Sequence, residues 1–285
     1  MNEDLPQPAP QIIKGDLLRP EELTKLKDQF DFVIHLAGEK RDPTLFDSVN
    51  AIGLKNLLEG LSSFKQFVLV SSVGVIGPPR STVVDEETPA RPLPGYESSK
   101  FLGEQLLTEF CRDRGYQYTI LRPTSVFGEF HPNRPLLNWM KQIGSGKFFY
   151  LGKQNVYFNY VYADDVAQAC CDVLENAKAS NQILQVATPV PLPDAVDTVA
   201  RELKVEPPKR RLPRWLGFAA GASLGTIQRV LGIRVPFDLR RYRDMVAPTI
   251  YSGRKLERDF GFTPKVGLRE GLRRLAQYYR AQGYL

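Results

Sequence analysis

Tyr96 and Lys100 stand four residues apart in the stretch Tyr96-Glu97-Ser98-Ser99-Lys100. Side chains at this spacing share one face of a helix and lie one turn apart. An ammonium group beside a phenol favours the phenolate and lowers the pKa of the phenol, so the tyrosine can exchange a proton with a substrate. Because the same spacing is common on solvated helix faces, the surrounding elements decide whether this pair does chemistry.

Apolar runs and helical segments alternate in the first half of the sequence. Residues 32–36, 67–70 and 118–121 predict buried parallel strands, and residues 46–61 and 96–112 predict helices between them. Strands that alternate with helices in this way form right-handed crossovers and a doubly wound sheet. We therefore predict an α/β, Rossmann-like fold with a parallel sheet.

Small or polar residues follow each predicted strand where it ends. Gly38 follows the first strand, Ser71 and Ser72 follow the second, and Thr124 with Ser125 follow the third. Ligands of a doubly wound sheet bind beyond the carboxyl ends of its strands. The helix with the tyrosine–lysine pair begins between the second and third strands, so we expect the pair to reach the same edge.

With these motifs, the sequence resembles the extended short-chain dehydrogenase/reductase family, in its NAD-dependent epimerase/dehydratase group. The resemblance runs from about residue 11 to the C-terminus. The matching motifs, in family order, are Gly15-Asp16-Leu17, His35-Leu36-Ala37-Gly38, Asn50 with Gly53, Ser71-Ser72 to Gly77, Tyr96-Glu97-Ser98-Ser99-Lys100, Leu121-Arg122-Pro123 to Gly128, Tyr160 to Val166 with Asp164-Asp165, and Phe260-Gly261-Phe262-Thr263-Pro264.

The resemblance implies reversible hydride transfer at a secondary alcohol or ketone, with NAD or NADP as cofactor. Tyr96 would be the acid/base, Lys100 would hold the nicotinamide ribose and lower the pKa of Tyr96, and Ser72 would hydrogen-bond the reacting oxygen. The implied cofactor-binding residues are Asp16, Leu17, His35, Leu36, Ala37, Gly38, Lys40, Asn50, Ser71, Lys100, Pro123, Thr124, Ser125 and Val126. The implied substrate contacts are Ser72, Phe127 and Phe158.

Several of these residues also have a purely structural interpretation. His35 can serve the strand through its backbone alone, and Asp16 can be a cap or turn residue. Ser71 and Ser72 can cap a turn, and Asn50 can be a helix-surface amide. The combination of motifs, rather than any single residue, favours the functional interpretation.

The front of the sequence departs from the family pattern. Residues 11–14 predict a strand that matches the family's third, and residues 20–29 predict a helix opened by Pro20 and acids. The family's Gly-x-x-Gly-x-x-Gly phosphate turn has no counterpart. We expect an unpaired edge on the strand at 32–36. Three explanations fit the missing motif: a start assigned too far downstream, a natural truncation, and completion by another chain. We favour the first. We then expect that the chain alone neither binds NAD(P) nor folds cooperatively.

The residues around the motifs narrow the reaction. Family dehydratases carry an Asp-Glu pair for elimination at this point, whereas Ser72 is followed by Val73-Gly74. We therefore do not expect a dehydratase. An aromatic run surrounds Phe158, where family sugar-nucleotide epimerases carry a phosphate-binding arginine. We therefore expect an oxidoreductase for an apolar, sterol- or flavonol-like alcohol. The alternatives are a nucleotide-sugar 4-epimerase and a catalytically silent NAD(P)-fold binding protein.

Composition limits the class of protein and its partners. The chain of 285 residues has a formal net charge of +6, two histidines and three cysteines. These counts predict no metal site and no disulfide framework, and favour a cytoplasmic location. The basic residues lack the interleaved aromatics of a nucleic-acid groove, so we expect small-molecule rather than nucleic-acid binding.

The C-terminal half predicts a smaller substrate lobe, drawn from about 125–150 and 185–260. Within it, residues 213–237 combine an uncharged stretch with flanking basic clusters. The stretch is too short to span a bilayer. It predicts a lid, a core-packed helix or a helix on an anionic membrane surface. A homodimer remains open.

Overall fold

A four-stranded parallel sheet forms the centre of the molecule. A computed structural model describes residues 11–26, 29–130, 134–152, 156–231 and 239–285. The strand order is β1-β2-β4-β9, with β1 at Gln29–His35, β2 at Ser63–Val70, β4 at Gln117–Pro123 and β9 at Gln182–Val186. Val68 of β2 lies beside Ile34 of β1 and Thr119 of β4. The three predicted strands are confirmed, in parallel register.

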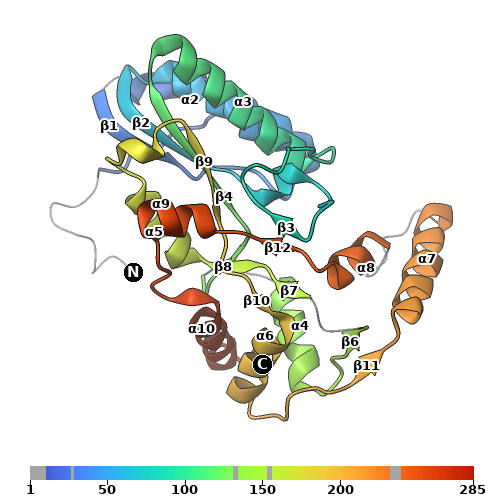
Figure 1. The fold of residues 1–285 in the computed structure, drawn as a ribbon. Helices are drawn as coiled ribbons and strands as arrows, with labels where there is room; N and C mark the ends of the chain where they lie inside the picture. Colours follow the sequence, from blue (N-terminus) through green and yellow to red (C-terminus); the bar gives the residue numbers. More distant parts are fainter. Residues whose placement is uncertain (1–10, 27–28, 131–133, 153–155, 232–238) are drawn as a thin grey trace.

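Helices cover both faces of this sheet (Figure 1). On one face, α2 (Leu54–Gly60) and α3 (Tyr96–Arg114) bury a core that includes Phe67 and Leu107. On the other face, α5 (Ala163–Asp172) and α9 (Arg254–Phe260) pack on residues such as Leu121 and Leu184. The predicted α/β fold is therefore confirmed, because each sheet face is apolar and each is covered.

A second layer lies beyond the carboxyl ends of the strands. Its helices are α4 (Arg134–Gly144), α6 (Leu192–Leu203) and α10 (Gly267–Ala281), which share a core around Phe127 and Leu272. Four two-stranded ladders join the layers: β5 (Ser125–Phe127) with β8 (Tyr160–Tyr162), β7 (Tyr157–Phe158) with β10 (Val190–Pro191), β6 (Tyr150–Leu151) with β11 (Arg211–Leu212), and β3 (Val83–Val84) with β12 (Ile250–Tyr251). The substrate role of this layer stays a prediction.

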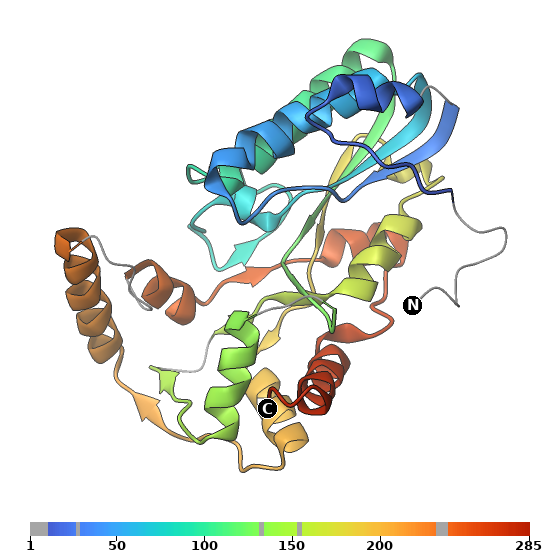
Figure 2. The ribbon, with the colours of Figure 1, turned by 180° about the vertical axis from the view of Figure 1, so that it is seen from behind.

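Two helices project sideways from the body of the protein. Figures 1 and 2 show α7 (Arg214–Leu231) and α8 (Leu239–Val246) on an arm that leaves the second layer after β11 and returns through β12. The arm covers most of the predicted 213–237 segment, of which residues 232–237 lie outside the described residues. Trp215 and Phe218 of α7 are exposed, so a core-packed helix is wrong for this part of the segment.

The start of the chain differs from the prediction. Residues 11–14 form no strand, and Ile12 is exposed. A strand needs a neighbour to receive its backbone hydrogen bonds, and residues 11–14 pair with no strand in the described part of the chain, where β1 pairs only with β2. The predicted unpaired edge of the 32–36 strand is thereby confirmed. The predicted helix at 20–29 is short, with α1 at Pro20–Leu23 followed by a 3₁₀ turn at Thr24–Leu26.

Four further short segments are a π-helix and three 3₁₀ turns. The first part of the predicted 46–61 helix is a π-helix at Ser48–Gly53, which continues into α2. A π-turn in a helix often marks a functional site. Additional 3₁₀ turns lie at Pro43–Leu45, Val73–Ile76 and Ala177–Ala179.

Candidate active site

The N-terminus of α3 presents Tyr96 at the carboxyl edge of the sheet. Gly95 precedes it with φ 111°, a backbone conformation that residues other than glycine rarely adopt. The hydroxyl of Ser98 accepts a hydrogen bond from the Gly95 N–H at 3.0 Å and donates to the Gly95 carbonyl at 2.9 Å. These bonds fix the start of α3 and, with it, the half-buried tyrosine.

Lys100 lies one turn further along α3 and is buried. Its Nζ donates to the Val70 carbonyl, at the end of β2, over 2.9 Å. Burial lowers the pKa of Lys100 to about 8, and the nearby Glu104 carboxylate opposes this shift. A side chain at Gly38 would come within 3.8 Å of Nζ, so the glycine leaves room beside the ammonium. The lysine is thus held at the strand ends while it is charged near neutral pH.

The pKa of Tyr96 differs from the expectation. Burial raises it, and the neighbouring Glu97 raises it further. Nζ of Lys100 donates to the Val70 carbonyl, and its ammonium is not among the causes of this shift. The direction is therefore opposite to the expected one in this structure, because burial favours the neutral phenol. The tyrosine is a neutral proton donor at neutral pH.

Ser72 caps the 3₁₀ turn that follows β2. Its Oγ accepts a hydrogen bond from the Gly74 N–H at 3.0 Å, so the hydroxyl keeps its proton for a further partner. The capping interpretation therefore describes this geometry, and it leaves the donor role of Ser72 as a prediction. Glu97 of α3 lies close by, since a side chain at Gly74 would come within 3.0 Å of its Cγ.

Asn50 ties three segments together beneath the site. Its amide nitrogen donates to the Glu39 carbonyl and to Ser99 Oγ, both at 2.9 Å, and its amide oxygen accepts from the Glu39 N–H at 2.8 Å. Ser99 in turn donates to the Tyr96 carbonyl at 2.8 Å. The buried asparagine on the π-helix thus joins the loop after β1 to α3, which the surface-amide interpretation does not describe.

His35 closes β1 and is buried against Phe67, with ring centroids 6.0 Å apart. Burial, and then the charge of Lys100, lower the pKa of His35 to about 4. The imidazole is therefore neutral above that pH. A neutral imidazole cannot pair with a phosphate as a cation. In this structure His35 therefore serves as the buried last residue of β1.

A buried ion pair fastens α3 to the sheet. Arg122 of β4 donates to Glu104 of α3 through Nε at 3.0 Å and through a terminal nitrogen at 2.6 Å. Both side chains are almost fully buried. A bidentate pair of this kind fixes orientation as well as distance. Motif reasoning missed Glu104, although its place one turn after Lys100 on a helix that meets an arginine-ended strand is a usable signal.

Two orphaned hydroxyls support a cofactor at this edge. Ser71 Oγ and Thr124 Oγ1 are buried and have no hydrogen-bond partner among the described residues. They directly follow β2 and β4, the places where a doubly wound sheet binds its ligand. Since a buried polar atom without a partner costs about 1–3 kcal/mol, these two fit contacts to a bound dinucleotide.

The remaining predicted cofactor residues lie around the same edge or along its approach. Leu36, Ala37 and Lys40 are exposed on the loop after β1, and Ser125 with Val126 begins β5. Pro123 is buried at the end of β4. At the front, Asp16 is exposed and its carboxylate accepts from the Leu18 N–H at 2.9 Å, which matches the turn interpretation. Leu17 packs partly buried against the α2–α3 core.

The two predicted substrate aromatics belong to a packed core. Phe127 is fully buried between Tyr160 and Tyr162, and Phe158 stacks on Trp139 with ring centroids 4.9 Å apart. Neither presents an open face in this conformation, so their contact with a substrate stays a prediction. What they do here is support the floor of the second layer.

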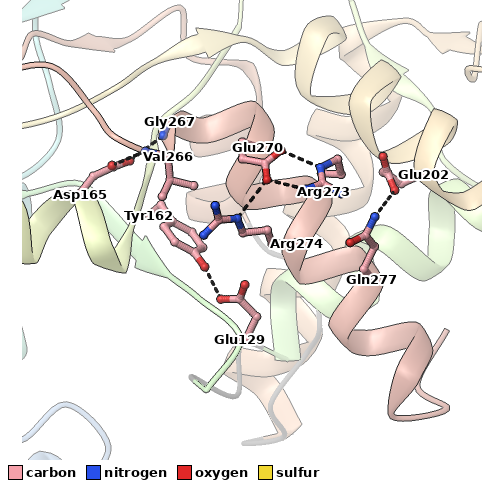
Figure 3. Close-up of polar contacts among 10 residues, drawn as sticks. All are labelled: Glu129, Tyr162, Asp165, Glu202, Val266, Gly267, Glu270, Arg273, Arg274 and Gln277. Carbon is pink, nitrogen blue, oxygen red and sulfur yellow. Dashed lines mark hydrogen bonds and ion pairs between the residues drawn. The ribbon is translucent and has the colours of Figure 1, made fainter. Parts of the chain in front are cut away.

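The second residue of the Asp164-Asp165 pair holds α10 in place. Figure 3 shows the Asp165 carboxylate accepting from the N–H groups of Val266 and Gly267, each at 2.9 Å. This buried carboxylate therefore caps α10. Beside it, Tyr162 donates to Glu129, and Glu270 accepts from Arg273 and Arg274 (Figure 3).

A surface cavity of about 870 Å³ opens near this second layer. Its walls come from the loop after β9, from the start of α9 and from the segment before α10. Ser72, Tyr96 and Lys100 are not among its lining residues, so the cavity is separate from the tyrosine–lysine pair. Chemistry at the strand ends, not cavity size, identifies the site.

Comparison with known proteins identifies the family. The profile described as "NAD dependent epimerase/dehydratase family" matches residues 1–187. The chain belongs to this family. It is thus an enzyme of the extended short-chain dehydrogenase type, and its cofactor is NAD or NADP.

Relatives in this family act on different substrates. The N-acetyl-alpha-D-glucosaminyl-diphospho-ditrans,octacis-undecaprenol 4-epimerase of Escherichia coli O157:H7 is 29% identical, over 93% of this chain and 82% of its own. The decarboxylating sterol-4-alpha-carboxylate 3-dehydrogenase of Saccharomyces cerevisiae is 25% identical, over 91% and 80%. A UDP-glucuronic acid 4-epimerase from Bacillus cereus, solved with NAD, superposes with a TM-score of 0.67 at 20% identity, over 95% and 80%, which shows a common fold.

Proposed function

We propose that this enzyme transfers a hydride reversibly between NAD(P) and a secondary alcohol or ketone, with Tyr96 as the acid/base. The observation that carries the proposal is the buried Lys100, held on the Val70 carbonyl one helical turn from the tyrosine. A charged lysine is costly to bury. Its place at the carboxyl edge, beside the orphaned hydroxyls of Ser71 and Thr124, supports a functional reason for that cost.

Each residue then has a defined task. The bound nicotinamide would supply the hydride acceptor or donor. The neutral Tyr96 hydroxyl gives a proton to a substrate carbonyl oxygen and becomes a phenolate, and in the reverse direction this phenolate takes the proton from the alcohol. The Ser72 hydroxyl donates a hydrogen bond to the same substrate oxygen, while Ser72 Oγ accepts one from the Gly74 N–H. The Lys100 ammonium stabilises negative charge that develops on the phenolate.

For the substrate, we propose a sugar joined through a diphosphate to a lipid, epimerised at one secondary hydroxyl. The undecaprenol-linked relative supports this class. So do the exposed apolar residues of α7, because a free nucleotide sugar needs no apolar surface. The predicted substrate lobe, from about 125–150 and 185–260, would bind this substrate opposite Tyr96.

Because the chain alone is expected not to bind NAD(P), the experiment first measures NAD binding by the purified chain. It then compares two glycosyl carriers with the same chain and added NAD. One reaction contains a short-chain polyprenyl diphosphate-linked N-acetylglucosamine, and the other contains UDP-N-acetylglucosamine. We expect a C4 epimer from the lipid-linked sugar, detected by NMR, with no net change in absorbance at 340 nm. Epimerisation of the UDP-sugar at an equal or higher rate would contradict the lipid-linked proposal and support the nucleotide-sugar alternative.

A second candidate is net oxidation of an apolar, sterol-like alcohol. The sterol dehydrogenase relative supports it, as does the buried aromatic stack of Phe158. Net oxidation consumes NAD, so a sterol alcohol would produce a steady rise at 340 nm, which an epimerase lacks. If no tested substrate turns over in a Tyr96-dependent way, a silent NAD(P)-fold binding protein becomes the better description.

A further inference from the structure

The net positive charge of the chain lies in one stretch that leads into α7 and includes it. Residues 207–237 contain six lysines and arginines and no acidic residue, and the formal net charge of the chain is +6. Outside this stretch, the 32 remaining basic residues equal the 32 acidic ones. The excess is therefore not a diffuse property of the surface. Lys209, Arg210, Arg211 and Arg214, which lead into α7, are all exposed.

The same part of the arm carries large apolar side chains in solvent. Trp215 is 66% exposed, Phe218 is 52% exposed, and Met245 on α8 is 45% exposed. Trp215 and Phe218 are three residues apart on α7 and so lie on neighbouring positions of one face. Scattered exposed apolar residues are ordinary, but aromatic residues gathered beside arginines are characteristic of a binding surface.

Packing within the arm explains why these residues point outward. Gly217 is buried, and a side chain there would come within 3.0 Å of both Leu151 and Tyr242. The glycine face of α7 therefore contacts the body and α8, while Tyr242 also meets Phe218 edge-on at 6.0 Å. Figures 1 and 2 show the arm projecting sideways beyond both layers, and Trp215 and Phe218 stay exposed in the described part of the chain.

Charge selects the occupant of this face. A second copy of the chain in a symmetric contact would bring one six-fold positive stretch against another, which like-charge repulsion opposes. An anionic phospholipid surface offers the opposite charge together with an apolar layer just below it. Tryptophan and arginine are suited to that boundary, where a ring reaches the acyl region and a guanidinium binds phosphate. No helix in the described part of the chain is long and apolar enough to cross a bilayer.

We infer that the arm of α7 and α8 docks this enzyme on an anionic membrane surface, with Trp215 and Phe218 inserted at the headgroup boundary. The inference rests on the exposed residues and the charge of the arm, and it holds whatever substrate the active site takes. Docking in this way brings an active site in the body of the protein close to lipid-borne molecules without embedding it.

Tryptophan fluorescence tests the inference, because the chain has two tryptophans. Trp139→Phe leaves Trp215 as the reporter and replaces a ring that stacks on Phe158. With vesicles of mixed phosphatidylglycerol and phosphatidylcholine, we expect a blue shift of the emission and quenching by brominated lipid. With pure phosphatidylcholine, the emission should change little. An unchanged emission with anionic vesicles would overturn the inference.

Vesicle flotation of the unsubstituted chain provides a second measurement that needs no reporter variant. Trp215→Ser with Phe218→Ser should weaken partitioning by about tenfold or more, since two large apolar side chains are lost. Phe130→Ser is the matched control, because Phe130 is 87% exposed but lies against Tyr278 of α10. Arg210→Gln should weaken binding about fivefold. Equal binding by the double variant and the control, or a Trp215 shift that depends only on protein concentration, would contradict membrane docking.

Discussion

Replacing the buried lysine tests the electrostatics of the site in isolation. Lys100 has a pKa of about 8 in the folded protein, against an ordinary value of 10.5. Between these two values the unfolded chain binds more protons than the folded chain, so the free energy of unfolding rises with pH. Below about pH 8 both states are protonated, and the folded state carries the full cost of the buried charge.

The magnitude follows from the two pKa values. From about pH 7 to about pH 9.5, the folded chain gains about 2 kcal/mol of stability from Lys100 alone. Lys100→Met removes this titration and keeps the length of the side chain. The difference in unfolding free energy between the unsubstituted chain and the variant should therefore shift by about 2 kcal/mol in favour of the unsubstituted chain as the pH rises over this range.

Urea unfolding followed by far-ultraviolet circular dichroism measures this difference. A urea unfolding curve is recorded for both proteins at each pH. The contributions of all other titrating groups then cancel when the two unfolding free energies are subtracted. A difference that stays constant with pH, or that moves in favour of the variant, would refute the account of a desolvated ammonium held on the Val70 carbonyl.

Three further substitutions test how α3 and the strand ends are held. Glu104→Ala should cost about 3–5 kcal/mol in urea unfolding because Arg122 is left buried without its partner, and Glu104→Met with Arg122→Met should recover most of that loss. Asn50→Ala should raise the Kd for NAD(P) and cost about 2 kcal/mol, since three hydrogen bonds around Glu39 and Ser99 disappear; calorimetric titration showing unchanged affinity would count against its role. Gly77→Ala should lower stability by about 2 kcal/mol or more, because φ is 71° and the new Cβ would lie 2.0 Å from the Arg91 carbonyl oxygen; an unchanged Tm would contradict this.

The parallel strands could be predicted because their side chains report burial directly. Residues 67–70 and 118–121 are apolar on both faces, and the structure covers both faces with helices. The start of α3 at Tyr96 could also be predicted, because the preceding segment with Pro94 and Gly95 cannot be helical. The strand predicted at residues 11–14 was wrong, because an apolar run indicates a tendency to pair but does not supply the neighbouring strand.

The chemistry of the site was less accessible from the sequence. Spacing placed Tyr96 and Lys100 on one helical face, but it could not show that Lys100 binds the Val70 carbonyl. Burial then decides the pKa of Tyr96, and burial is a property of the whole fold. The role of Asn50 depends on a π-turn that shifts the helical phase, which a 3.6-residue period does not predict.

Exposure of the arm could also not be read from its composition. As a pattern, residues 213–237 fitted a lid, a core-packed helix and a membrane-surface helix, with the core-packed helix slightly favoured over the membrane-surface one. The buried Gly217 and the exposed Trp215 separate these, because they show which face of α7 meets the protein.

The most direct test of the central claim is hydride transfer by the Tyr96→Phe variant. The purified chain and the variant are compared with NAD(P) and the substrate proposed above, with product formation and cofactor binding measured separately. We predict that kcat falls by about 10²–10⁴-fold, while the Kd for NAD(P) and the unfolding free energy stay close to those of the unsubstituted chain. Equal turnover by both proteins would contradict the assignment of Tyr96 as the proton-transferring group.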